Sequence, residues 1–134
     1  MPLTTIQGLR NTLPKVFAQK AALAERFFDT IFRHAPEMEA FFPRHYGRRK
    51  EVFVLLLTRV ALCAERPAAL EGVAQQMVRV HRPLGIRPVH YDIGAHAMIE
   101  AFETILSDRL SRAELDRWFE AITGLTRRLA ELAV

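Results

Sequence analysis

Cysteine is nearly absent from this sequence of 134 residues, because Cys63 is the only one. No disulfide can form within the chain, and nothing in the composition indicates an oxidising compartment. Long apolar runs are lacking too: the N-terminal segment has no apolar stretch typical of a secretory signal, and the longest run, residues 52–57, is far too short to cross a bilayer. We therefore expect a soluble, cytoplasmic protein with no membrane partner.

The sequence also lacks the short motifs of several common chemistries. It has no GxxxxGK or GxGxxG loop for phosphates, no GxSxG around a nucleophilic serine, and no HExxH or CxxC for zinc. None of the other four histidines pairs with His81 at a spacing of four residues. The net charge of +4 comes from 16 arginines and 3 lysines scattered among acidic residues, so we expect a solvated surface and no nucleic-acid partner.

What the sequence does contain is helical periodicity. Half of the residues are apolar and a quarter are charged, which is ordinary for a globular protein with one core. The apolar residues recur at spacings of three and four between prolines and glycines, a pattern typical of helices and not of strands. Because the chain has this length and no repeat or linker, we expect an all-α fold in one domain, residues 1–134.

Local signals place the helix boundaries. Ser111 followed by Glu114 is the pattern of a capping box, and Pro88 suits the first position of a helix. We expect helices that begin at Thr4 or Thr5, near Ala21, at Pro36, after a corner at residues 44–48, near Leu70, at Pro88 and after Ser111. The long helix after the corner is expected to turn one stripe inward, formed by Arg49, Phe53, Leu56, Val60 and Cys63.

His81 interrupts an otherwise apolar helix face, with Met77 and Leu84 one turn away. A buried imidazole needs a polar partner, so one hypothesis is a structural hydrogen bond to a carbonyl or a tyrosine hydroxyl. The other is axial ligation of a flat apolar cofactor, haem, in a crevice between helices. The residues alone leave both hypotheses open.

Three segments of the chain resemble bacterial globins and the globin domain of flavohaemoglobins. Residues 81–93, HRPLGIRPVHYDI, are similar to the proximal-histidine pattern H-x-x-L/F-x-I/V-x-P-x-x-Y of these proteins. Residues 26–37, RFFDTIFRHAPE, are similar to their F-Y-D-x-x-F-x-x-x-P-E segment, and residues 41–43, FFP, to the phenylalanine that packs against the porphyrin. Trp118 in the last helix also fits. The matches keep their order and approximate spacing over nearly the whole chain.

The resemblance implies a globin fold whose helices pack around one crevice for haem b, with His81 as the iron ligand. It makes Phe42 the ring that packs on the haem face and Tyr91 the tyrosine that hydrogen-bonds to His81. Arg79 and Arg82 are the candidates for binding a haem propionate. The other cofactor-binding residues that we expect are Phe28, Arg49, Phe53, Met77, Ile86 and Met98.

Departures from the globin pattern concern the gas-binding side and the proximal network. Phe28 stands where these globins usually have a tyrosine that donates a hydrogen bond to oxygen, which a phenyl ring lacks. The spacing from Trp118 puts Ala133 where a glutamate usually completes the proximal network. The position that usually holds glutamine or histidine aligns with Arg49, with Lys50 or Arg48 as alternatives, and His45 or Tyr46 of the corner are further candidates for the gas-binding side.

These features favour a haem protein that reversibly binds oxygen, nitric oxide or carbon monoxide at an iron held by His81, for example in oxygen transport. One alternative is a nitric-oxide dioxygenase that works with a separate reductase, and the phenylalanine at position 28 weakens that case. Another alternative is a sensor domain that responds to a gas or to the redox state of the haem. Both a monomer and a homodimer are compatible with the sequence.

Overall fold

The computed structural model describes residues 5–134, which form six α-helices and three short 3-10 helices and contain no strand. The prediction of an all-α chain is confirmed. Thr4, one of the two expected starting points of the first helix, lies outside the described residues. The elements in order are α1 (Thr5–Ala18), α2 (Lys20–His34), η1 (Pro36–Phe41), α3 (Tyr46–Glu65), η2 (Pro67–Ala69), α4 (Leu70–His81), η3 (Arg82–Leu84), α5 (Pro88–Leu106) and α6 (Arg112–Leu132).

Most helix boundaries follow the local signals in the sequence. The predicted capping box at the start of α6 is present, because the Glu114 amide donates to the Ser111 hydroxyl and the Glu114 carboxylate accepts from the Ser111 amide. Gly85 has a φ of 84° in the turn before α5, a conformation that favours glycine. The predicted corner is shorter than expected: α3 begins at Tyr46, whose hydroxyl donates to the carbonyl of Ala21 at 3.3 Å.

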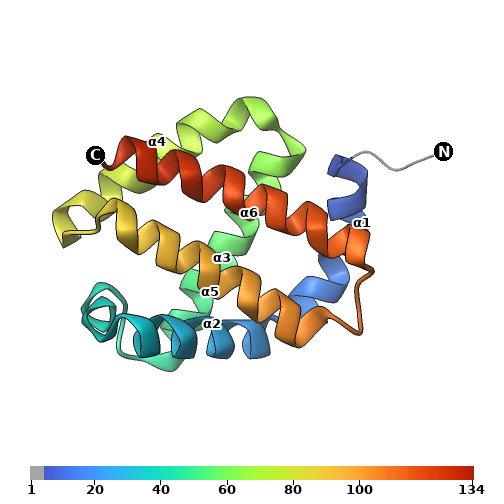
Figure 1. Cartoon of the computed structure of the whole chain (residues 1–134), viewed down its shortest axis with the longest axis horizontal. Helices are drawn as coiled ribbons and strands as arrows, with labels where there is room; N and C mark the ends of the chain where they lie inside the picture. Colours follow the sequence, from blue (N-terminus) through green and yellow to red (C-terminus); the bar gives the residue numbers. More distant parts are fainter. Residues whose placement is uncertain (1–4) are drawn as a thin grey trace.

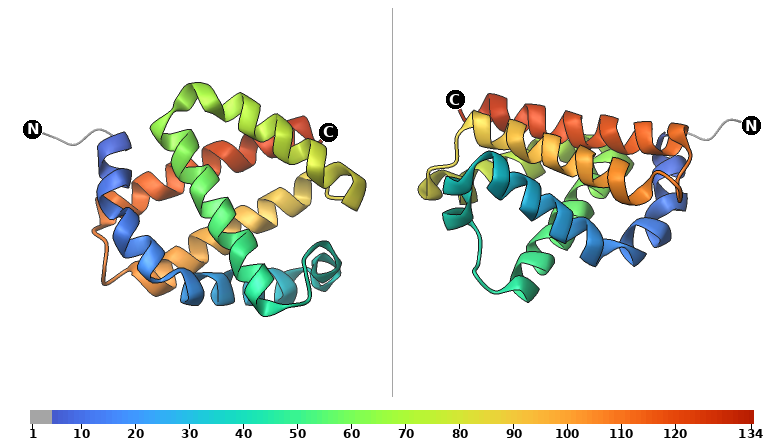
Figure 2. Two further views of the ribbon diagram at one scale, coloured as in Figure 1. Left: turned by 180° about the vertical axis from the view of Figure 1, so that it is seen from behind. Right: turned by 60° about the horizontal axis from the view of Figure 1, so that its bottom comes forward.

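The helices are arranged in two layers. Figure 1 shows α5 and α6 side by side and running in opposite directions, with α2 along the other side of α5. The green helix α3 crosses behind them and packs against α1. In the view from behind, α3 lies in front and its chain continues into α4, which packs on α6 (Figure 2). No helix in the described part of the chain is long and apolar enough to cross a membrane.

One hydrophobic core runs through the described helices, and Trp118 lies fully buried in it. The indole packs on Phe102, with 5.2 Å between ring centroids, and its Nε1–H donates to the hydroxyl of Thr12 at 2.7 Å. The Thr12 hydroxyl in turn donates to the carbonyl of Leu9, so the buried polar groups are paired. Cys63 is buried, as its expected place in a core stripe requires, and burial raises the pKa of its thiol.

Candidate cofactor site

Residues of η1 and η3, the short helices at the left of Figure 1, help to line an apolar cavity. Residues of α2, η1, α3, α4, α5 and α6 line it, and most of them are phenylalanine, leucine, isoleucine, valine or methionine. Its volume of about 290 Å³ is at the lower end of the range for small-molecule pockets, roughly 300–1,000 Å³. The cavity is therefore suited to an apolar ligand.

The cavity mouth carries exposed apolar side chains. Val52 and Leu55 of α3 face it from one side, and Val80 of α4 and Leu84 of η3 face it from the other. Val80 is 62% exposed and Leu84 is 49% exposed. Clusters of exposed apolar groups on soluble proteins commonly mark a place where another molecule binds. A flat apolar ligand in the cavity would cover these side chains.

His81, the last residue of α4, is the polar group best placed to bind a ligand atom in the cavity. Its Nδ1 lies 3.1 Å from the hydroxyl oxygen of Tyr91, and among the described residues its Nε2 has no hydrogen-bond partner. Burial lowers the pKa of His81, and the positive charge of Arg59 lowers it further, so the ring is held neutral. When Nδ1 carries the proton and donates to Tyr91, the lone pair of Nε2 is free for a metal ion.

Tyr91 of α5 positions this imidazole. The side chain is 8% exposed, and burial raises the pKa of the phenol to about 12, so the hydroxyl stays protonated at neutral pH. The predicted hydrogen bond between His81 and Tyr91 is confirmed. A glutamate that would extend this network is missing, because position 133 is alanine and Glu131 pairs with Arg128 at 3.0 Å.

The structure brings most of the predicted cofactor residues together around one cavity. Those that line it are His81, Phe42, Phe53, Met77, Ile86, Tyr91 and Met98. They come from distant parts of the chain, so the sequence pattern has grouped residues that the fold places side by side. Their role in binding a cofactor stays a prediction. The two remaining predicted cofactor residues, Phe28 and Arg49, lie outside the cavity lining.

Phe28 does not line the cavity, contrary to expectation. Its ring packs edge-on against Phe42, with centroids 5.0 Å apart, and stacks on Phe32 at 5.8 Å. The neighbouring residue Phe27 lines the cavity together with Ile31, one turn further along α2. The reason is helical rotation: adjacent residues point about 100° apart, as follows from 3.6 residues per turn. Phe28 therefore packs against Phe42, which lines the cavity, without lining the cavity itself.

Arg49 also lies outside the cavity lining. Its Nε donates to the carbonyl of Pro43 at 2.5 Å, its guanidinium is 3.4 Å from Glu39, and it stacks over the ring of Phe32 at 4.9 Å. These contacts hold the side chain across η1 and α2. The other expected candidates for the gas-binding side, His45, Tyr46, Arg48 and Lys50, do not line the cavity either.

The cationic side chain in the cavity is Arg59, which the sequence analysis missed. Arg79 and Arg82, the expected partners of a propionate, line a separate surface hollow beside the end of α6. Arg82 donates there to the carbonyl of Leu132 at 3.1 Å. The sequence does contain a feature that points to Arg59: the spacing of Val52, Leu55, Leu56 and Arg59 places all four on one face of α3.

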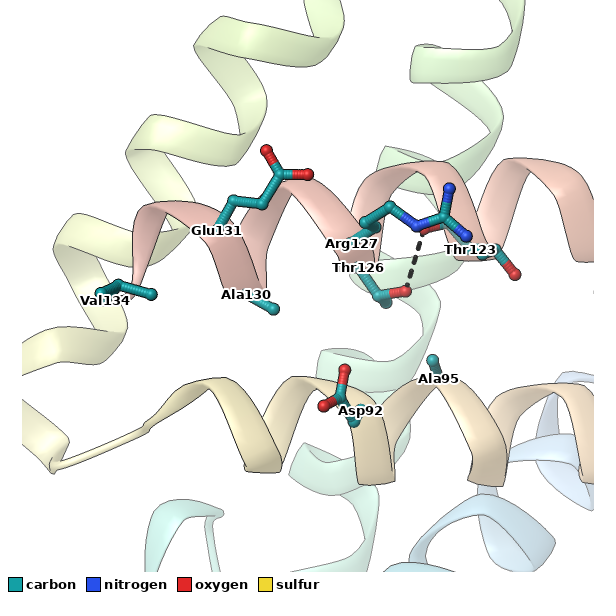
Figure 3. A pocket seen from close by; sticks show the side chains of 8 residues that line it. All are labelled: Asp92, Ala95, Thr123, Thr126, Arg127, Ala130, Glu131 and Val134. Atoms are coloured by element: carbon teal, nitrogen blue, oxygen red, sulfur yellow. Dashed lines mark hydrogen bonds between the residues drawn. The ribbon is translucent and has the colours of Figure 1, made fainter.

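A second hollow lies on the surface between α5 and α6 (Figure 3). Its volume of about 470 Å³ exceeds that of the cavity, but it is an open groove with short side chains such as Ala95 and Ala130. Asp92 and Arg127 reach into it from the two helices, and the Thr126 hydroxyl is bonded to the carbonyl of Thr123 at 3.3 Å. The groove holds no histidine or cysteine. The candidate site is therefore the cavity that contains His81.

Several known proteins are similar to this chain over most of its length. No protein-family model matches the sequence. The chain is similar to flavohemoproteins: it is 24% identical to the one of Vibrio cholerae over 119 residues, covering 87% of this chain and 30% of the relative. It is 27% identical to the one of Halalkalibacterium halodurans over 120 residues, covering 87% of this chain and 29% of the relative. The chain thus spans less than a third of the length of these relatives.

Solved structures with the same fold cover almost the entire chain. One is an engineered carbene transferase, a putative nitric oxide dioxygenase from Rhodothermus marinus, with a TM-score of 0.76 and 23% identity over 98% of this chain and 94% of that one. Another is a bacterial globin from Campylobacter jejuni, with a TM-score of 0.75 and 20% identity over 96% of this chain and 94% of that one. The likeness shows a common fold.

Proposed function

We propose that this chain, a protein of globin fold similar to the globin domain of flavohaemoglobins, binds haem b through His81 and holds a diatomic gas at the haem iron. The observation that supports the proposal most directly is the pair formed by His81 and Tyr91: the hydroxyl occupies Nδ1 at 3.1 Å, which leaves Nε2 as the unpaired nitrogen of a residue that lines the apolar cavity. The names of the relatives, flavohemoprotein and bacterial globin, support the same proposal.

The residues of the cavity fit a haem group. Its lining is apolar, and its exposed rim would be covered by a flat ring. Within residues 5–134 no three histidine, cysteine or acidic side chains are grouped to hold a metal ion by themselves. A single imidazole instead suits an iron that a porphyrin already holds by four nitrogens. When bound, the haem iron supplies a position at which oxygen, nitric oxide or carbon monoxide is held reversibly.

The two sides of the cavity have different chemistry. On the His81 side, Tyr91 fixes the ring orientation and accepts a hydrogen bond from Nδ1–H, which makes Nε2 a stronger electron donor. On the α2 and α3 side, Phe27, Ile31 and Val52 present no hydrogen-bond donor. We therefore expect a site that favours carbon monoxide over oxygen, because oxygen is the more polar ligand and gains more from a donor.

A test of this function compares haem binding by the wild-type chain and two histidine variants. Titration of the wild type with hemin should give a Soret band at one haem per chain. His81→Ala should lose the spectrum of histidine-ligated haem and regain it when imidazole is added. His34→Ala is the matched control, because His34 is exposed on α2 and should leave the spectrum unchanged. Identical spectra for wild type and His81→Ala would overturn the proposal.

A second candidate function is a nitric-oxide dioxygenase that works with a reductase. The observation in its favour is the likeness in fold to the engineered carbene transferase from Rhodothermus marinus, a putative nitric oxide dioxygenase. The apolar side chains of Phe27 and Val52 argue against it, because neither carries a donor that would hold oxygen for the reaction. Catalytic production of nitrate from nitric oxide and oxygen, sustained by an added reductase and lost in His81→Ala, would favour this candidate over simple gas binding.

A further inference from the structure

Arg59 extends the cavity-facing stripe of α3 by one turn. Val52, Leu55, Leu56 and Arg59 are separated by three, one and three residues, so they share one helix face, and all four line the cavity. The long aliphatic stem of an arginine packs well beside leucines, whereas its guanidinium needs water or a polar partner. The position of Arg59 thus brings a fixed positive charge to an otherwise apolar site.

The other polar side chains of the cavity wall already have partners within the protein. His81 and Tyr91 bond to each other, the Nδ1 of His90 accepts the amide proton of Arg87 at 2.9 Å, and Thr126 donates to the carbonyl of Ile122 at 2.8 Å. Among the side chains that the structure describes, none forms an ion pair or a hydrogen bond with Arg59, and no carboxylate lines the cavity. The guanidinium is thus the cationic group of the wall with which an anionic group of a ligand can pair.

Two other partly buried arginines on the helices are paired with carboxylates. Arg26 pairs with Glu100, and Arg128 pairs with Glu71 at 2.7 Å and with Glu131 at 3.0 Å. These ion pairs join residues of different helices or of successive turns of one helix. Arg59 is partly buried without such a carboxylate, and a charge withdrawn from water is unfavourable unless it is paired. An anionic group on the ligand would supply the missing partner.

We propose that Arg59 binds a propionate carboxylate of the haem and thereby fixes which way round the cofactor lies in the cavity. This proposal rests on the proposed function and assigns the role that the sequence had suggested for Arg79 or Arg82. The planar guanidinium fork matches a carboxylate through two parallel hydrogen bonds, and such charge-assisted pairs are about twice as strong as neutral ones. Arg59 would act as a positioning residue, through its bond to the propionate.

The test uses two forms of the cofactor, hemin and its dimethyl ester, in which both propionates are uncharged. Dissociation constants of both are measured by Soret titration for the wild type, Arg59→Met, Arg59→Lys and the control Arg79→Met. The wild type should prefer hemin by about tenfold or more, which corresponds to about 1.4 kcal/mol. Arg59→Met should lose this preference, Arg59→Lys should keep part of it, and Arg79→Met should keep it fully.

A second readout is the orientation of the bound cofactor. Proton NMR of the ferric protein resolves the haem methyl signals of the two orientations, and Arg59→Met should show a more even mixture than the wild type. A preference for hemin that persists in Arg59→Met would overturn the assignment while leaving the His81 proposal intact. An altered rate of oxygen release with an unchanged preference would also overturn it. A wild-type chain that gives no Soret band with either form would overturn both proposals.

Discussion

Tyr91→Phe isolates the hydrogen bond that holds the proposed iron ligand. The substitution removes one oxygen atom and keeps a ring that is 8% exposed, so the packing around it should persist. His81 then loses the partner of its Nδ1 at 3.1 Å. A hydrogen bond of this kind contributes about 0.5–1.5 kcal/mol. We therefore expect haem affinity to fall by roughly two- to tenfold, at 1.4 kcal/mol for each factor of ten.

Two measurements follow this change. The first is the rate at which haem leaves the protein for an excess of an apoglobin acceptor, which should rise by the same factor. The second is the iron–histidine stretching frequency of the ferrous protein in resonance Raman spectra, which should fall because an imidazole without an acceptor at Nδ1 donates fewer electrons through Nε2. The frequency reports on ligation itself, which a change in general stability would not move.

Tyr46→Phe is the matched control for this experiment. Tyr46 also loses a hydroxyl bond, to the carbonyl of Ala21 at 3.3 Å, but it stands at the start of α3 and does not line the cavity. The control should leave both the haem transfer rate and the stretching frequency unchanged. If Tyr91→Phe behaves like Tyr46→Phe in both measurements, the reasoning about the His81–Tyr91 pair is refuted.

Two further predictions concern residues away from the proposed ligand. Arg49→Leu should leave the ratio of oxygen to carbon monoxide affinity unchanged, because its contacts hold the guanidinium outside the cavity; a selective loss of oxygen affinity would contradict that placement. The hydrogen bond from the Arg128 guanidinium lowers the pKa of Glu71 from 4.5 to about 2. The ionised carboxylate therefore stabilises the folded state fully above pH 4.5, and this contribution to the free energy of unfolding is lost as the pH falls toward 2. Urea unfolding midpoints measured between pH 6 and pH 3 should fall less for Glu71→Gln than for the wild type, and equal falls would contradict the assigned pKa.

The parts of the site that the sequence predicted well depend on short stretches of chain. His81 and Tyr91 lie ten residues apart across one turn, and the intervening Pro83, Gly85 and Pro88 leave that turn few conformations. The resulting approach of the two side chains therefore follows from local geometry. Helix boundaries such as Ser111 are local in the same sense.

The remaining parts depend on how each helix is rotated about its axis. Residues 52–57 are all apolar, so two different faces of the helix could point inward, one that contains Phe53 and one that contains Val52. The apolar periodicity therefore cannot show that the face containing Val52 also contains Arg59 and lines the cavity. The choice between Phe27 and Phe28 on α2 has the same origin. The stacking of Arg49 on Phe32 is a tertiary contact that no local pattern encodes. Tertiary packing decides these rotations.

The exposed apolar rim of the cavity also affects the tendency of the protein to aggregate in the cell. The side chain of Val80 is 62% exposed and forms, with Leu55 and Leu84, an apolar edge whose contact with water is unfavourable. If the proposed function holds, a newly synthesised chain exposes this edge to other chains until haem covers it. We therefore expect the yield of unaggregated protein to rise with the supply of haem in the host cell.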